Sequence, residues 1–202
     1  HRTMWAELQN AEEPIIGALE MDAACVVVNL FMLPDEPDLF RQCVRNIATV
    51  RAACATYGMP LMIEPLVMLP NEVRGGYQVD GDADKIVPLV RLAAEMGADI
   101  IKADPTDRAE DFHRVVEAAR VPVLVRGGGK EDLRAVLQKS AALLAQGALG
   151  LALQLELGED LDVAPRRPDG SLELEKVDRI LFTPTRPGAV LREAASRGLP
   201  VG

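Results

Sequence analysis

One lysine stands where an apolar run ends, and this position makes it the first candidate for chemistry. The stretch GADIIKADPT, residues 97–106, predicts a buried strand that reaches Lys102. Burial of an ammonium without a partner is costly and favours the neutral amine, which attacks carbonyl compounds. Lys102 is therefore a candidate imine-forming residue. The alternative is a structural lysine whose ammonium reaches solvent or pairs with Asp104.

Polar side chains also occupy neighbouring predicted strands. Glu64 lies within LMIEPLVM, and Asp104 shares its strand parity with Lys102, so that both point to one face. A carboxylate beside a reactive amine can move protons, but either one can equally be an ion-pair partner of Lys102 or of an arginine. Asn29, near the end of the first strand, is a candidate to bind a substrate hydroxyl or to cap a loop.

A glycine-rich loop follows a later apolar strand in the sequence VPVLVRGGGK. Arg126, Gly127, Gly128 and Gly129 precede a predicted helix, where free backbone N–H groups and the helix dipole favour an anion such as phosphate. The alternative is a plain strand-to-helix turn, because a triple glycine is not a Walker A motif.

Histidine is scarce, and this limits the catalytic mechanisms that the chain can support. The chain has two histidines, His1 and His113, and its three cysteines show no C-x-x-C spacing. We therefore expect no catalytic metal site and no Ser-His-Asp or Cys-His arrangement. Lysine chemistry that needs no cofactor remains as the main covalent option.

The elements that must position these residues alternate between short apolar strands and amphipathic helices. Strands are predicted near residues 24–33, 60–68, 98–104, 121–126 and 148–157, with helices at 38–58, 82–97, 108–120 and 130–147. This alternation is typical of parallel βα units, and no G-x-G-x-x-G follows the first strand. With polar residues at successive strand ends, the pattern predicts an α/β fold of the TIM (β/α)8 barrel type.

The barrel is expected to be incomplete at its N-terminus. Residues 1–157 hold the barrel units, and the first 23 residues contain part of a helix without a convincing strand. Residues 158–178 are rich in proline, glycine and charge, so we expect 158–202 to form a loop and a diverged tail of unknown role.

Composition limits the partners. The 202-residue chain carries a net charge of −9, which argues against nucleic acid and anionic membranes but permits a phosphorylated small molecule held locally. No window is long and apolar enough for a transmembrane helix, and nothing resembles a signal peptide. We expect a cytoplasmic protein in which Cys25, Cys43 and Cys54 are reduced and at least half-buried.

Three segments carry a resemblance to a known family. MPLMIEPLVM, GGYQVDGDADKIVPLVRLAAEMGADIIKADPT and VPVLVRGGGK are similar to class I aldolases of the DhnA, or archaeal fructose-bisphosphate aldolase, type. Lsr-type thiolase/aldolase proteins of the wider DeoC/LacD group are relatives. The resemblance covers roughly residues 13–152 and implies a (β/α)8 barrel, usually a homo-oligomer, of which this chain holds about the fourth to eighth strands. It implies that Lys102 forms the Schiff base and that Arg126, Gly127 and Gly128 hold substrate phosphate.

The chain departs from the family pattern at three places. The family's first strand carries an Asp-His-Gly type motif, which is absent here, and its eighth-strand Gly-Arg-Asn motif is replaced by Gln154, Leu155 and Glu156. Leu66 occupies the position of a tyrosine proton donor, which leaves Glu64 as the nearest polar substitute.

The sequence thus predicts a class I aldolase-type lyase that acts on a phosphorylated keto-sugar. Lys102 forms the imine, Glu64 or Asp104 moves protons, and the Arg126–Gly129 loop grips phosphate. Two alternatives stay open: a catalytically impaired barrel remnant with a structural or assembly role, and a related Lsr-type thiolase/aldolase.

Overall fold

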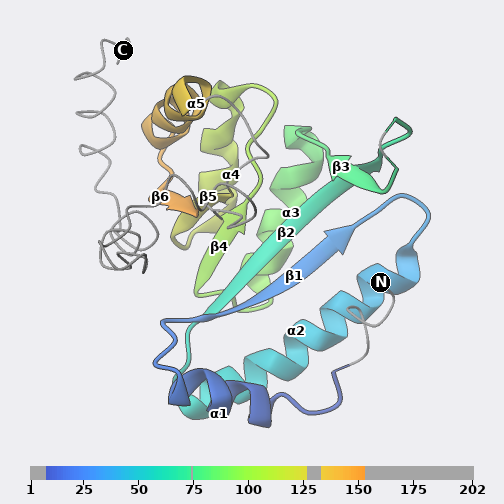
Figure 1. The fold of residues 1–202 in the computed structure, drawn as a ribbon, viewed down its shortest axis with the longest axis vertical. Coiled ribbons are helices and arrows are strands. Elements are labelled where there is room, and N and C mark those ends of the chain that lie inside the picture. The colour runs from blue at the N-terminus through green and yellow to red at the C-terminus, as the bar shows by residue number, and fades with distance from the viewer. Residues whose placement is uncertain (1–7, 74, 127–132, 153–202) are drawn as a thin grey trace, which may run out of the picture.

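A computed structural model describes residues 8–73, 75–126 and 133–152 of the chain. The predicted tail, residues 158–202, and the replaced motif at Gln154–Glu156 lie outside these residues. The described elements, shown in Figure 1, are α1 (Glu12–Glu20), β1 (Val26–Met32), α2 (Pro37–Tyr57), β2 (Leu61–Pro70), β3 (Tyr77–Val79), α3 (Ala83–Glu95), β4 (Ile100–Ala103), the 3₁₀ turn η2 (Ala109–Asp111), α4 (Phe112–Ala119), β5 (Val123–Arg126), α5 (Leu133–Ala145) and β6 (Gly150–Ala152).

The main sheet is parallel and its strands follow chain order. The order is β1-β2-β4-β5-β6, and each of these neighbouring pairs is parallel. A doubly wound Rossmann sheet would reverse its strand order at a switch point, whereas a barrel winds in one direction. The described part of the chain is therefore one arc of a (β/α) barrel, as predicted from the sequence.

One face of the sheet packs against the helices. Along β4 and β5 the buried positions alternate with half-buried ones, and Ile101, Ala103, Val123 and Val125 are 2% exposed or less. These side chains join a single core with helical residues such as Ile47 and others from α3, α4 and α5. In Figure 1, α2 lies beside β1, α1 lies near the C-terminal end of α2, and α5 lies beside β6. The opposite face, which carries the polar residues, corresponds to a barrel interior.

Two helix boundaries follow from local chemistry. α2 ends at Gly58, whose φ of 67° is left-handed and therefore suits glycine. At the start of α3, the side chain of Asp82 accepts a hydrogen bond from the backbone N–H of Asp84, and Pro88 is accommodated inside the helix. Both helices match the ranges predicted from their apolar spacing.

A hairpin at the end of β2 is not predicted from the sequence. β2 continues to Pro70, and β3 pairs with it in antiparallel fashion, with Met68 opposite Val79. The predicted helix over 108–120 also differs, because η2 precedes an α-helix that begins only at Phe112.

Two further expectations concern the burial of the cysteines and the presence of membrane-spanning helices. Cys43 and Cys54 are buried and Cys25 is half-buried, and all three are free, which confirms the predicted placement. Among the helices of the described ranges, none combines the length and apolarity needed to span a bilayer.

Replacement of Gly81 by alanine is expected to destabilise the protein by about 1–3 kcal/mol. An added Cβ would lie 2.1 Å from Oδ1 and 2.9 Å from the backbone nitrogen of Asp107, which itself donates a hydrogen bond to the Gly81 carbonyl. Gly17→Ala is the matched control: no heavy atom lies within 4 Å there, and alanine should stabilise α1 by about 0.5–1 kcal/mol. Urea unfolding measures both changes, and equal effects of the two substitutions would contradict the packing argument.

Candidate active site

The sheet register brings four charged side chains together on the face opposite the helices. Met62 pairs with Ile100 and Ile63 with Ile101, which places Glu64 beside Lys102 on the next strand. Asp104 and Arg126 meet in the same way, one residue beyond the paired Ala103 and Val125. Glu64, Lys102, Asp104 and Arg126 form a group called here the charge cluster.

Lys102 is paired with Glu64 and not with Asp104. The Nζ atom of Lys102 lies 3.2 Å from Oε2 of Glu64, and the two side chains are 14% and 10% exposed. An amine at hydrogen-bond distance from a carboxylate can exchange its proton with that carboxylate. The pair therefore has the two components that imine chemistry needs, a primary amine and an adjacent acid–base group.

Arg126 connects the two carboxyl groups of the cluster. Its Nε lies 3.1 Å from Oε1 of Glu64, and its Nη1 donates a hydrogen bond of 2.7 Å to Oδ1 of Asp104. Glu64 therefore contacts both cations, one through each oxygen. The sequence left Glu64 open as an ion-pair partner of Lys102 or of an arginine, and the structure shows that it contacts both.

Asp104 is the most deeply buried member of the cluster, at 2% exposure. Burial raises the pKa of this carboxyl above its ordinary value, and this effect outweighs the opposing attraction of Arg126. Its Oδ2 atom is buried without a hydrogen-bond partner among the described residues. Ionisation of Asp104 therefore costs free energy in the folded state.

This cost predicts a pH dependence of stability. Because the folded protein keeps the Asp104 proton at pH values where the unfolded chain has lost it, the free energy of unfolding should fall as pH rises above the ordinary Asp value of 3.8. Asp104→Asn removes this titration, so the stability of the variant relative to wild type should increase with pH across that window. Urea unfolding of both proteins from about pH 4 to 7 measures the difference. A difference that is constant, or that runs the other way, would contradict the argument.

The remaining predicted site residues lie outside the charge cluster or outside the described residues. Asn29 pairs in register with Glu64, yet it is exposed on β1. Leu66 is buried on β2, two residues beyond Glu64 and on the same face. Gly127, Gly128 and Gly129 are not among the described residues, so their predicted contact with phosphate stays a prediction. Within the described ranges, no group of three or more His, Cys, Asp or Glu side chains could hold a metal ion.

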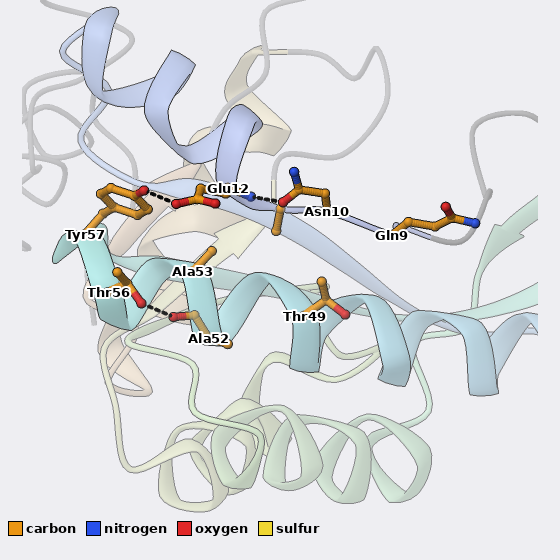
Figure 2. A pocket seen from close by; sticks show the side chains of 9 residues that line it. Gln9, Asn10, Glu12, Thr49, Ala52, Ala53, Thr56 and Tyr57 are labelled. Carbon is orange, nitrogen blue, oxygen red and sulfur yellow. Dashed lines mark hydrogen bonds between the residues drawn. The ribbon is translucent and has the colours of Figure 1, made fainter.

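A separate hollow lies between the start of α1 and the C-terminal half of α2, with a volume of about 270 Å³ (Figure 2). Its polar groups are used locally: Tyr57 donates to Glu12, Asn10 accepts from the Glu12 backbone, and Thr56 donates to the Ala52 carbonyl. No residue of the charge cluster lines it. The hollow is therefore separate from the charge cluster.

Comparison with known proteins gives a family match and several relatives. The model of the DeoC/LacD family aldolases matches residues 1–156. A 2-amino-3,7-dideoxy-D-threo-hept-6-ulosonate synthase from Halobacterium salinarum is 33% identical over 117 residues, which cover 58% of this chain and 40% of that enzyme. A 3-hydroxy-5-phosphonooxypentane-2,4-dione thiolase from Salmonella paratyphi A is 32% identical over 110 residues, covering 54% of this chain and 34% of the thiolase.

The fold also matches solved structures. A Schiff-base-forming fructose-1,6-bisphosphate aldolase superposes with a TM-score of 0.58 and 25% identity, covering 69% of this chain and 53% of the aldolase chain. This chain therefore spans less than half the length of the two curated relatives and about half of the solved aldolase. The match confirms the barrel-type fold predicted from the sequence.

Proposed function

The chain belongs to the DeoC/LacD family of aldolases, and on that premise we propose that it is a class I aldolase-type lyase whose imine-forming residue is Lys102. Its proposed substrate is a phosphorylated keto-sugar, in which it makes or cleaves a carbon–carbon bond. The observation that carries the proposal is the Lys102 side chain, which is 14% exposed and whose amine nitrogen lies 3.2 Å from the Glu64 carboxylate.

Each step of the proposed reaction uses a group of the charge cluster. The amine nitrogen of Lys102 adds to the substrate carbonyl carbon, and loss of water gives a protonated imine. The imine then accepts the electron pair that is released when the neighbouring carbon–carbon or carbon–hydrogen bond breaks, which yields an enamine. Glu64 is placed to take the proton that this step liberates and to return it when the bond forms in the reverse direction.

The substrate phosphate is proposed to bind at the glycine-rich residues 127–129, which follow β5 in the sequence. This assignment comes from the family resemblance of RGGGK and from the general affinity of glycine-rich strand-to-helix loops for anions. No metal or cofactor is needed for this chemistry.

Reductive trapping tests the proposal. The protein is incubated with dihydroxyacetone phosphate, reduced with sodium borohydride, digested and mapped by mass spectrometry. We expect the adduct mass on the peptide that contains Lys102 and not on the peptide of Lys139, an exposed lysine of α5. Full peptide coverage with no adduct at Lys102 would refute the proposal and favour a structural role for the barrel units.

A thiolase reaction is the second candidate, and the similarity to the Salmonella enzyme favours it. Both reactions break a carbon–carbon bond next to a carbonyl group, but the thiolase reaction passes an acyl group to a thiol. Turnover of a phosphorylated 2,4-diketone only in the presence of a thiol would distinguish it from simple aldol cleavage.

A further inference from the structure

Arg126 is held by two carboxyl groups that are both more buried than the arginine itself. Its side chain is 31% exposed, whereas those of Glu64 and Asp104 are 10% and 2% exposed. Its Nε and Nη1 atoms face Oε1 of Glu64 and Oδ1 of Asp104, at 3.1 Å and 2.7 Å. The planar guanidinium thus spans two strands and joins the two acids in a fixed geometry.

This arrangement is unsuited to gripping phosphate. A phosphate that approached Arg126 would meet the negative charge of Glu64 at the same guanidinium. Withdrawal of Arg126 toward a ligand would also leave Asp104 without its hydrogen-bond donor, and Oδ2 of Asp104 already has no partner among the described residues. Leaving a buried polar group unpaired is costly, so the arginine is stabilised where it is.

The same contacts fix the orientation of Glu64. With Oε1 engaged by Arg126, the other oxygen, Oε2, is the one that faces Nζ of Lys102 at 3.2 Å. If Arg126 were absent, the carboxylate could rotate and use both oxygens on the lysine. The order of contacts therefore runs from Asp104 to Arg126, then to Glu64, and then to Lys102.

We propose that Arg126 is a positioning residue that is anchored by Asp104, that orients Glu64 against Lys102, and that does not bind the substrate phosphate. The inference rests on the proposed function, since it assigns how the proton-transfer group of that reaction is held. If Arg126 does not bind the phosphate, other groups of the protein must select phosphorylated substrates.

A pair of probes separates positioning from phosphate binding. Wild type and Arg126→Met are compared for exchange of carbon-bound hydrogens in D₂O, the step in which Glu64 moves the proton. The two probes are dihydroxyacetone phosphate and dihydroxyacetone, which lacks the phosphate. If Arg126 positions Glu64, both probes should lose rate by the same factor, about 100-fold as for a misplaced catalytic group. A loss confined to the phosphorylated probe would overturn the inference. Arg114→Met is the matched control, because Arg114 forms an exposed 2.7 Å ion pair with Asp84 away from the cluster.

A double-mutant cycle tests whether Arg126 acts through Glu64. In a Glu64→Gln background, the further change Arg126→Met should have little additional effect on the rate of hydrogen exchange, whereas independent roles would give multiplied losses. Arg126→Lys keeps the positive charge but lacks the planar guanidinium that contacts both carboxyl groups. It should therefore be more stable than Arg126→Met and have the same reduced exchange rate.

Urea unfolding of the same four proteins gives a second cycle in the free energy of unfolding, which does not depend on enzyme activity. Coupling between Arg126 and Glu64 in the unfolding free energy supports the contact, and additive effects would overturn it. If wild type exchanges no hydrogen in either probe and forms no borohydride adduct, the proposed function fails, and the unfolding cycle still decides whether Arg126 holds Glu64.

Discussion

Replacement of Lys102 by methionine is expected to abolish imine formation and to leave the fold intact. Methionine keeps the length and apolar stem of the side chain but removes the amine. Glu64 keeps a charged partner in Arg126, 3.1 Å away, so the substitution does not leave an unpaired carboxylate in the sheet. Activity should fall by about 10⁴-fold or more, because loss of the nucleophile in a covalent enzyme can cost on the order of 10⁶ in kcat.

Two measurements check this outcome. Borohydride trapping reports the imine, and proton NMR in D₂O reports exchange of the carbon-bound hydrogens of dihydroxyacetone phosphate, which requires the enamine. Lys102→Arg is the matched control, since it keeps the charge beside Glu64 but cannot act as the amine nucleophile. Exchange at the wild-type rate in either variant would mean that another group carries the reaction.

The barrel-type fold could be predicted because its signals are local. Each main strand is a short apolar run, and the helices between strands show an amphipathic spacing. α2 ends at Gly58, and Gly97 follows the end of α3. The β2–β3 hairpin gave no such signal. All three residues of β3, Tyr77–Val79, are exposed, so the strand has no buried face to produce an alternating pattern. Its position is fixed by pairing with the end of β2, which is a tertiary effect.

The charge cluster was only partly predictable. Parity along β4 places Lys102 and Asp104 on one face, but parity cannot decide which carboxylate reaches the amine. The register between strands decides it, since Met62 opposite Ile100 puts Glu64 next to Lys102. The contacts of Arg126 with two carboxyl groups also depend on register, and the glycines that follow it in the sequence favoured its interpretation as a phosphate ligand.

The paired charges explain how the sheet tolerates ionised groups on a half-buried face. Two cations and two acids alternate across three adjacent strands, and each cation contacts at least one acid. Glu64 is the shared member, because it contacts both Lys102 and Arg126. Its removal should therefore disturb the cluster more than removal of either cation.

Replacement of Glu64 by glutamine is expected to separate imine formation from proton transfer in the proposed reaction. Lys102 keeps its amine, so borohydride trapping should persist. Hydrogen exchange in dihydroxyacetone phosphate should fall by about 10²–10⁴-fold, the usual contribution of a general acid–base group. The NMR exchange assay and the trapping assay, run on the same preparation, give the two rates. Exchange at the wild-type rate would identify Asp104 as the proton carrier instead, and Asp104→Asn would then show the loss.

The same substitution should also lower stability, because it leaves Lys102 and Arg126 without the carboxylate between them. We expect a loss of about 2 kcal/mol, less than the roughly 3–5 kcal/mol for fully buried pairs, since Arg126 is partly exposed. Glu95→Gln is the matched control: Glu95 forms a 2.7 Å pair with Arg91 on the surface of α3, and its loss should cost at most about 0.5 kcal/mol. Urea unfolding of the two variants measures the contrast. Equal losses would mean that the cluster is no more stabilising than a surface ion pair, and that Glu64 is free to move away from Lys102.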